Sequence, residues 1–558
     1  MPSSLCVLAD VSFHWPDGQP VLEHVSHSFF CGRCGLIGRN GSGKSTLLRL
    51  LAGDLVPDGG AFRRVGEVGY IPQTIVLDRC ATVAELLGIA PVVAAMRAIA
   101  SGSADPEHFA LVGDRWGIEE EALAHLARLC LLDRLSRRGG DPLSRSVSEL
   151  SGGEVMAVAL AGKLVARPDI LLLDEPTNNL DRRGRDWLYR EVSGWQGILV
   201  AASHDVELLG IMDEIVEVRR VGVRVFGGDY SLYDDRARNE REAVERKVRD
   251  AEANLGREKR QRQAAEARNS RKRRAGARDR ANSKFPKAAA NLRRSRAEAS
   301  SGKARLAREE RLASAGAALR QLKMDAMPDE AIDVALPDTV VPIGKTVLEM
   351  TASGRTVSIR GPERIVLGGP NGSGKTSLLR TILGEAALPG VEIEAVVPEV
   401  GYLSQRLDFP DESAGVLDTL RLAAPGLSPN GARARLAQFL LKGDGRMDLP
   451  AAALSGGERF RLALACLLSA SPSPKLLLLD EPTNNLDLAS IGELASSLNS
   501  YRGALIVASH DRRFLASLST TRAWEMDNLR LVADRALDCD PGWTKKMRQS
   551  RASGWRKP

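Results

Sequence analysis

Four motifs in the first half of this 558-residue chain return, in the same order, in the second half. The repeated pairs are 38–45 and 369–376, 150–154 and 454–458, 172–181 and 478–487, and 202–205 and 508–511. Ten residues in a row are identical in the third pair. A chain of this length is too long for a single hydrophobic core. The repeat therefore predicts two similar domains.

The spacing of the motifs differs between the halves in one place. Gln73 and Gln405 are 332 residues apart, whereas Ser151 and Ser455 are 304 apart. The first half therefore holds 28 extra residues, by subtraction, between Gln73 and Ser151. A helix-like stretch at 119–132 lies in this region, so we expect the extra residues to enlarge a helical subdomain.

Short unbroken apolar runs precede the acidic and histidine motifs. They lie at 170–173, 198–202, 476–479 and 505–508. Runs of this kind are typical of parallel strands that are buried on both faces. Open parallel sheets bind ligands where their strands end. Each half is therefore predicted to be α/β, with its motifs at one edge of the sheet.

The glycine-rich runs that end in Lys-Ser or Lys-Thr are suited to binding nucleotide phosphates. Backbone N–H groups and a helix N-terminus would surround the phosphates, and Lys44 and Lys375 would reach the β- and γ-phosphates. Ser45 and Thr376 would hold Mg²⁺. The residues expected to contact ATP in these loops are Gly38, Asn40, Gly41, Ser42, Gly43, Lys44, Ser45, Thr46, Gly369, Asn371, Gly372, Ser373, Gly374, Lys375, Thr376 and Ser377.

An acidic pair follows each buried strand. Asp174 and Asp480 are predicted to bind Mg²⁺, because a hard cation prefers oxygen ligands. Glu175 and Glu481 come one residue later and could deprotonate the attacking water. A carboxylate pair in isolation is usually solvated surface, but the preceding strand and phosphate loop favour a catalytic role here.

These motifs resemble those of the ATP-binding cassette superfamily, over roughly Leu5 to Tyr233 and Val340 to Leu531. The Leu-Ser-Gly-Gly-Glu signature is the specific element. The resemblance implies two cassettes packed head to tail, with each ATP between one phosphate loop and the signature of the other half. The signature residues at helix N-termini suit a γ-phosphate. They are Ser151, Gly152, Gly153, Ser455, Gly456 and Gly457.

The same resemblance implies roles for further residues. Gln73 and Gln405 resemble lid glutamines that meet Mg²⁺ and the water, and His204 and His510 resemble switch histidines at the γ-phosphate. Trp15 resembles the aromatic residue that stacks on adenine. The second half has no Phe, Trp or Tyr between residues 330 and 368. We therefore expect the two nucleotide sites to be unequal.

The segment between the two halves carries most of the positive charge. Residues 241–320 hold 25 Lys/Arg and 10 Asp/Glu, a local +15 in a chain of net charge +7. Apolar residues at spacings of four and three near both ends predict two antiparallel helices with a coiled-coil seam. They are Val244, Val248, Ala251 and Leu255 near the start and Leu312, Ala315, Leu319 and Leu322 near the end. Phe285-Pro286 would mark the turn. The alternative is a solvated, disordered linker, but so dense a charge favours a polyanion such as RNA.

Two cassettes, a basic linker and Glu-Pro-Thr-Asn-Asn-Leu-Asp in both halves together resemble the ABC-F family. The resemblance implies binding of the ATP-bound closed form at the ribosomal tRNA exit site, with rRNA and tRNA contacts made by the linker. Members of this family act in translation or protect ribosomes against antibiotics, and the sequence does not separate these two roles. The alternatives are the ATP-binding subunit of a transporter with separate membrane domains, or a DNA-associated ATPase.

The predicted architecture is two P-loop α/β nucleotide-binding domains joined by a long antiparallel helical hairpin. The predicted boundaries are 1–233 for the first domain, 234–327 for the linker, 328–535 for the second domain and 536–558 for a basic tail. No apolar run long enough to span a membrane and no secretory leader is evident. We expect a soluble, cytoplasmic, monomeric ATPase whose two cassettes pair within one chain.

Overall fold

The structure is a computed structural model. It describes residues 5–16, 18–30, 32–73, 75, 81–136, 140–178, 180–219, 221–282, 306–307, 309–320, 339–404, 407–439, 441, 444–484 and 486–536. The described residues up to Tyr230 and those from Thr339 onward cluster into one compact unit, and those from Ser231 to Arg320 form a second.

The first cassette contains two sheets. The antiparallel sheet has the order β2-β1-β4, and the six-stranded sheet has the order β5-β6-β7-β3-β8-β9, parallel except for β9 at its edge. The strands are β1 (Leu5–His14), β2 (Pro20–Phe29), β3 (Gly32–Ile37), β4 (Gly59–Val65), β5 (Val68–Ile71), β6 (Ile170–Asp174), β7 (Ile198–Ala202), β8 (Glu214–Val218) and β9 (Val223–Gly227).

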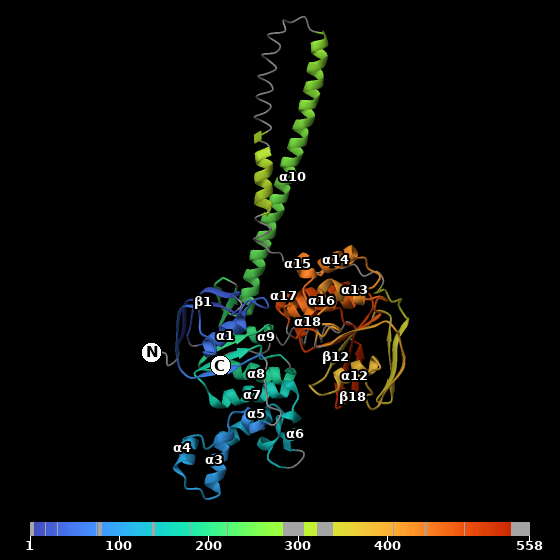
Figure 1. Cartoon of the computed structure of the whole chain (residues 1–558). Helices are drawn as coiled ribbons and strands as arrows, with labels where there is room; N and C mark the ends of the chain where they lie inside the picture. Colours follow the sequence, from blue (N-terminus) through green and yellow to red (C-terminus); the bar gives the residue numbers. More distant parts are fainter. Residues whose placement is uncertain are drawn as a thin grey trace, which may run out of the picture. The chain divides into compact units, whose positions relative to one another are not determined.

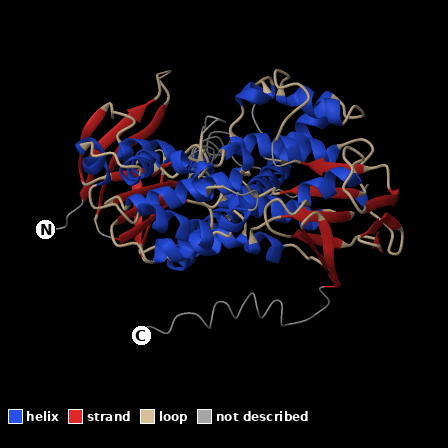
Figure 2. Ribbon diagram, turned by 90° about the horizontal axis from the view of Figure 1, so that it is seen from below, coloured by secondary structure: helices blue, strands red, loops and turns tan. Residues whose placement is uncertain are grey.

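The second cassette repeats this topology. Its antiparallel sheet has the order β11-β10-β13, and its six-stranded sheet has the order β14-β15-β16-β12-β17-β18. The strands are β10 (Thr346–Ala352), β11 (Arg355–Arg360), β12 (Arg364–Gly368), β13 (Val391–Val396), β14 (Val400–Leu403), β15 (Leu476–Asp480), β16 (Ala504–Ala508), β17 (Arg522–Asp527) and β18 (Arg530–Ala536). Helices lie against the strands of both cassettes (Figure 2).

Apolar runs and polar caps explain where these elements begin and end. All five residues of β6, β7, β15 and β16 are buried, as expected for parallel strands covered on both faces.

The helices of the first cassette are α1 (Lys44–Ala52), α2 (Val83–Leu86), α3 (Ala90–Ala100), α4 (Pro106–Val112), α5 (Ile118–Arg128), α6 (Leu132–Ser136), α7 (Gly152–Ala166), α8 (Arg182–Ser193) and α9 (Val206–Leu209). Those of the second are α12 (Lys375–Ile382), α13 (Val416–Ala423), α14 (Pro429–Gln438), α15 (Asp444–Met447), α16 (Gly456–Ser469), α17 (Leu488–Ser500) and α18 (Arg512–Ser517).

The extra residues of the first half are helical, as the sequence predicts. Five helices, α2 to α6, lie between Gln73 and Ser151, whereas the matching part of the second cassette holds α13, α14 and α15 among its described residues. Helices α3 and α4 pack on each other and lie together in Figure 1. Asp105 caps α4 by accepting from the Glu107 N–H at 2.9 Å.

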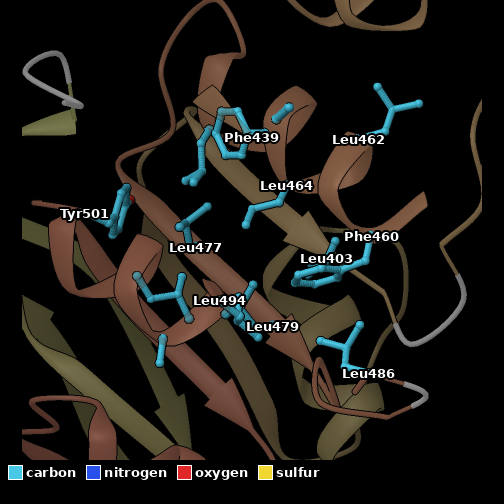
Figure 3. Close-up of a cluster of buried hydrophobic side chains, with 14 of the residues drawn as sticks. Leu403, Phe439, Phe460, Leu462, Leu464, Leu477, Leu479, Leu486, Leu494 and Tyr501 are labelled. Carbon is cyan, nitrogen blue, oxygen red and sulfur yellow. The ribbon is translucent and has the colours of Figure 1, made fainter. Parts of the chain in front are cut away.

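A hydrophobic cluster in the second cassette ties its helices to the sheet. Leu477 and Leu479 from β15 lie with Leu464 from α16 and Leu494 from α17 (Figure 3), and all four are fully buried. Burial of a leucine side chain contributes roughly 1.5–3 kcal/mol. The helix that follows the signature and the helix that follows the acidic motif are therefore fixed on the strand that carries the acids.

The linker unit contains one very long helix, α10 (Tyr230–Asn282), drawn in green in Figure 1. A second helical segment spans 309–320. The charge of Glu309 acts on Arg262 of α10, which places the two segments near each other at that point. The predicted seam positions, Val244, Val248, Ala251, Leu255, Leu312, Ala315 and Leu319, are all partly buried in helices with mostly exposed side chains.

Some sequence predictions lie outside the described residues. They are the turn at Phe285-Pro286, the last seam residue Leu322, the lid candidate Gln405 and residues 537–558 of the basic tail. The predicted domain boundaries stay predictions. The long helix begins at Tyr230, close to the boundary expected at 233.

A close helix contact in the first cassette is open to test. A Cβ added at Gly162 of α7 would lie 2.4 Å from the backbone oxygen of Leu87, so Gly162→Ala should push α7 away from α2. We expect a loss of about 1–3 kcal/mol, the range for overpacked interiors, seen as a lower Tm in thermal unfolding. In the matched control Gly492→Ala, also inside a helix, the new Cβ meets no atom within 4 Å. The control should keep or raise the Tm, and equal losses in both variants would contradict the close approach of α7 to α2.

Candidate functional site

The two phosphate loops have nearly the same geometry. Lys44 Nζ donates to the Gly38 oxygen at 2.8 Å, and Lys375 Nζ donates to the Gly369 oxygen at 2.8 Å. Three glycines of each loop have positive φ, and the last of them, Gly43 or Gly374, directly precedes the helix. Both lysines are buried. The loops therefore hold each lysine across a curved backbone at a helix N-terminus, where phosphate binds favourably.

The acidic pairs stand where β6 and β15 end. Asp174 pairs with Ala202 in the parallel ladder, and the next residue turns sharply, because Glu175 has φ 49°. Glu481 has the same left-handed backbone, with φ 46°. Its N–H donates to the Ala508 oxygen at 2.8 Å, as that of Glu175 does to Ala202. Left-handed backbone at a non-glycine residue is strained and clusters at functional sites.

Each candidate histidine lies against the glutamate of its own cassette. Glu175 accepts from the His204 N–H at 3.3 Å, and His204 Nε2 lies 3.3 Å from its other oxygen. Glu481 and His510 repeat both distances. Lys375 Nζ is also 3.3 Å from His510 Nε2. The structure thus brings lysine, glutamate and histidine together at both sites, as the sequence predicts.

Burial shifts the proton affinity of these groups. It raises the pKa of Glu175 to about 8 and that of Glu481 to about 7. Lys44 opposes the rise at Glu175, whereas Lys375 and Arg185 both oppose it at Glu481. Burial, and next the nearby lysine, lowers the pKa of both His204 and His510 to about 3. The imidazoles are therefore neutral at pH 7.

The residues at the strand ends fit a magnesium ion. Asp174 hydrogen-bonds Ser45, and Asp480 hydrogen-bonds Thr376, so each carboxylate is next to the predicted hydroxyl ligand. Asp174 Oδ1 is buried and has no hydrogen-bond partner among the described residues, nor have the hydroxyls of Ser42 and Ser373. Buried polar atoms without partners are uncommon in folded proteins. The carboxylate oxygen of Asp174 is a hard ligand that suits Mg²⁺. The hydroxyls of Ser42 and Ser373 are donors that suit phosphate oxygens.

The signature motif forms a capping box in each cassette. Ser151 Oγ accepts from the Glu154 N–H at 3.4 Å, and Glu154 accepts from the Ser151 N–H at 2.7 Å. In the second cassette Glu458 accepts from the Ser455 N–H at 3.1 Å. The signature serines therefore fix the start of α7 and α16. An added Cβ at Gly152 or Gly456 would have no atom within 4 Å, so each glycine faces open space on its side-chain side.

Sequence reasoning missed the aspartate that ends each repeated acidic motif. The Asn40 N–H of the first phosphate loop donates to Asp487 Oδ2 at 3.0 Å, and the Asn371 N–H of the second loop donates to Asp181 Oδ2 at 3.2 Å. Each loop is therefore in contact with the other cassette. The repetition of these aspartates within the identical run 172–181 and 478–487 was the available signal.

The connection that carries Trp15, the residue predicted to stack on adenine, is longer than the matching turn of the second cassette. Trp15 lies in the five-residue connection between β1 and β2, packs edge-on against Phe13 at 5.2 Å and has the Arg49 guanidinium 5.9 Å from its ring. In the second cassette only Ser353-Gly354 joins β10 to β11, both with positive φ. The second cassette therefore lacks a counterpart of the five-residue connection that carries Trp15.

The lid candidates are placed only in part. Gln73 follows β5 and is exposed, two residues beyond the last strand residue, Ile71. The corresponding strand β14 ends at Leu403, two residues before Gln405. The role of both glutamines at Mg²⁺ stays a prediction.

Two α/β units with paired phosphate loops, acidic strand ends and reciprocal contacts define a twin-cassette nucleotide-binding protein. The family profile described as "ABC transporter" matches residues 22–178 and 353–484. Tylosin resistance ATP-binding protein TlrC of Streptomyces fradiae is 34% identical, over 92% of this chain and 95% of its own. Energy-dependent translational throttle protein EttA of Mycobacterium tuberculosis is 31% identical, over 91% of this chain and 89% of its own.

A solved structure shares the fold. The structure named RNase-L Inhibitor superposes with a TM-score of 0.53 at 17% identity, over 97% of this chain and 92% of its own. With these matches, the chain belongs to the ATP-binding cassette family, and within it to the ABC-F proteins. Among the described residues, none of the helices has the length and apolar content needed to cross a membrane.

The unequal adenine ends lead to a prediction about base binding. Trp15→Ala should weaken ATP at the first site by about 1–3 kcal/mol, the scale of base–aromatic stacking, whereas the second site should not respond. Lys375→Ala isolates the first site and Lys44→Ala the second, and calorimetry on each measures the affinity. Trp15→Phe, which keeps an aromatic ring, should retain most of the binding. Equal losses at both sites would show that Trp15 serves packing and not adenine.

Proposed function

We propose that this chain hydrolyses ATP at two composite sites and that its ATP-bound, closed form binds the ribosome. The supporting observation is the pair of reciprocal hydrogen bonds, Asn40 to Asp487 and Asn371 to Asp181. Each phosphate loop contacts the other cassette, so ATP bound in either loop would affect how the two cassettes pack together. The ATP-binding domains of this family imply ATPase activity in general.

Hydrolysis in this proposal uses the same residue types at each site. Lys44 or Lys375 and the loop amides hold the phosphates, and Glu175 or Glu481 accepts a proton from the attacking water. The water oxygen bonds to the γ-phosphorus while the bond to the bridging oxygen breaks, which leaves ADP and phosphate. The neutral His204 or His510 donates a hydrogen bond toward the γ-phosphate without adding charge.

Bound Mg²⁺ would neutralise phosphate charge. Its proposed ligands are Ser45, Asp174 and Gln73 at the first site and Thr376, Asp480 and Gln405 at the second. The signature of the opposite cassette would complete each site, with the N-termini of α7 and α16 directed at the γ-phosphate.

The ribosome is proposed as the partner on two grounds. TlrC is named for tylosin resistance and EttA for translational throttling, and both match this chain almost end to end. The composition of the linker is suited to RNA, because residues 268–296 hold 12 Lys/Arg and one acid. We propose that the protein acts as a cytoplasmic monomer, with rRNA and tRNA contacts at the linker, in translation or in protection against antibiotics.

The first test concerns the proposed bases. Glu175→Gln together with Glu481→Gln should abolish ATP turnover but keep ATP bound, because the amide retains the shape of the carboxylate and cannot accept the proton. The variant should therefore accumulate on ribosomes in the presence of ATP, as measured by co-sedimentation. The control Lys44→Ala with Lys375→Ala should not accumulate, since it lacks the phosphate contacts. Turnover at the parent rate in the glutamine variant would reject the assignment of the bases.

The second test concerns the linker. Replacement of Arg271, Lys272, Arg273 and Arg274 by alanine should weaken ribosome binding, because fewer RNA phosphates are neutralised. The salt dependence of binding should flatten by roughly one unit of slope for each phosphate that the linker no longer neutralises. Basal ATP hydrolysis should be kept. Binding is measured by sedimentation across a salt series.

A matched control removes the same charge from α10 before residue 260. The residues for it are Arg236, Lys247, Arg257 and Lys259, which are all exposed. This variant should lose less affinity for the ribosome than the test variant if residues 268–296 make the contact with RNA. Equal affinities in parent, test and control would reject the linker as the ribosome-binding element. Growth with and without tylosin then separates resistance from a general role in translation.

A further inference from the structure

The helix after the acidic motif differs between the cassettes at one position. Helices α8 and α17 begin alike, because Asp181 and Asp487 each accept a hydrogen bond from the N–H three residues on. The offset of 306 residues pairs Arg185 of α8 with Ile491 of α17. Ile491 packs against the hydrophobic core of its own cassette. A charged side chain thus stands at a position where the other copy has an apolar one.

Contacts within the first cassette fix the side chain of Arg185. Its Nε donates to the Leu180 oxygen at 3.2 Å, and its Nη1 donates to Asp205 Oδ2 at 3.3 Å. Tyr189 also donates to Asp205 Oδ2, at 2.6 Å. The second cassette has alanine, Ala495, at the position that matches Tyr189. The guanidinium is therefore held by a set of partners that only the first copy of the repeat possesses in full.

Two contacts between the cassettes lie on either side of Arg185. Asp181, one helical turn earlier, accepts from the Asn371 N–H at 3.2 Å, and residues four apart lie on the same face of a helix. On the other side, Glu207 of α9 forms an ion pair with Arg512 of α18 at 3.6 Å. Both links lead to the second phosphate loop and its histidine segment.

Negative groups of both cassettes surround Arg185. Burial lowers the pKa of its guanidinium, but the negative charge of Asp205, and then of Tyr189 and of Glu481 and Asp511 in the second cassette, raises it above the usual value. Its side chain is only 15% exposed, so the interaction is weakly screened by solvent. The carboxylates of Asp205, Asp511 and Glu481 would repel one another across the boundary if this positive charge were absent.

We propose that Arg185 is a positioning residue that the first cassette supplies to the second ATP site, where it holds Glu481 and His510 in place when the cassettes are closed. The first site receives Ile491 at the matching position and has no such contribution. Hydrolysis at the second site is therefore tied to closure by a contact that the first site lacks. The inference rests on the proposed ATPase function, with Glu481 as the base of the second site.

The test measures each site alone. In a Glu175→Gln background only the second site turns over, and in a Glu481→Gln background only the first does. Arg185→Ile, which copies the second cassette, should lower kcat at the second site roughly five- to tenfold with KM for ATP nearly unchanged. The loss at the first site should be at least threefold smaller. Arg185→Lys, which keeps the charge, should restore most of the second-site rate.

Two controls separate this role from folding. Arg183→Ile removes an exposed arginine from the same helix and should leave both rates unchanged. Thermal unfolding compares all variants, and Arg185→Gln, which keeps polar contacts but no charge, replaces Arg185→Ile if the latter does not fold. Equal losses at both sites, or no rescue by lysine, would overturn the inference. A Glu175→Gln protein without any turnover would overturn the assignment of Glu481 itself, and the inference with it.

Discussion

Burial of strands β6 and β15 on both faces is the constraint on which the sites depend. Every residue of these strands is buried, including Asp174 and Asp480 at their ends. The N–H groups of Glu175 and Glu481 still bond to the neighbouring strand, but the backbone turns into the left-handed region at both residues. That turn points each glutamate toward its histidine and lysine. The surrounding sheet holds this strained backbone in place, as is common at functional sites.

The local parts of both sites could be predicted from the sequence because they depend on neighbours in the chain. A glycine-rich loop before a helix, and acids after an apolar strand, have few structural alternatives. The structure has the buried strands and the helical insert where the sequence predicts them, whereas the roles of the lysines and acids stay predictions. Contacts that join residues about 190 and 450 positions apart, Asp181 to Asn371 and Asn40 to Asp487, could not be derived in this way. They depend on how two complete domains meet.

The repeat hides differences that only the structure makes interpretable. The absence of an aromatic residue from 330 to 368 is visible in the sequence, and the structure adds that only Ser353-Gly354 joins β10 to β11 where the first cassette has the five-residue connection that carries Trp15. In the sequence, Arg185 is one of several arginines in a polar segment. Only the structure shows its hydrogen bond to Asp205 and the nearby charges of the second cassette. The two proposed ATP sites thus have the same residue types and differ in what surrounds Glu175 and Glu481.

Asp181 and Asp487 divide their work between two oxygens. Oδ1 caps the aspartate's own helix, accepting from Gly184 or Ser490 at 2.9 and 2.8 Å, while Oδ2 accepts from the opposite phosphate loop. If the cassettes separate in the proposed ATP cycle, the Oδ1 contact would keep each helix start intact while only Oδ2 returns to water. Each aspartate would then be held ready for reclosure, without the entropy cost of ordering its helix start again.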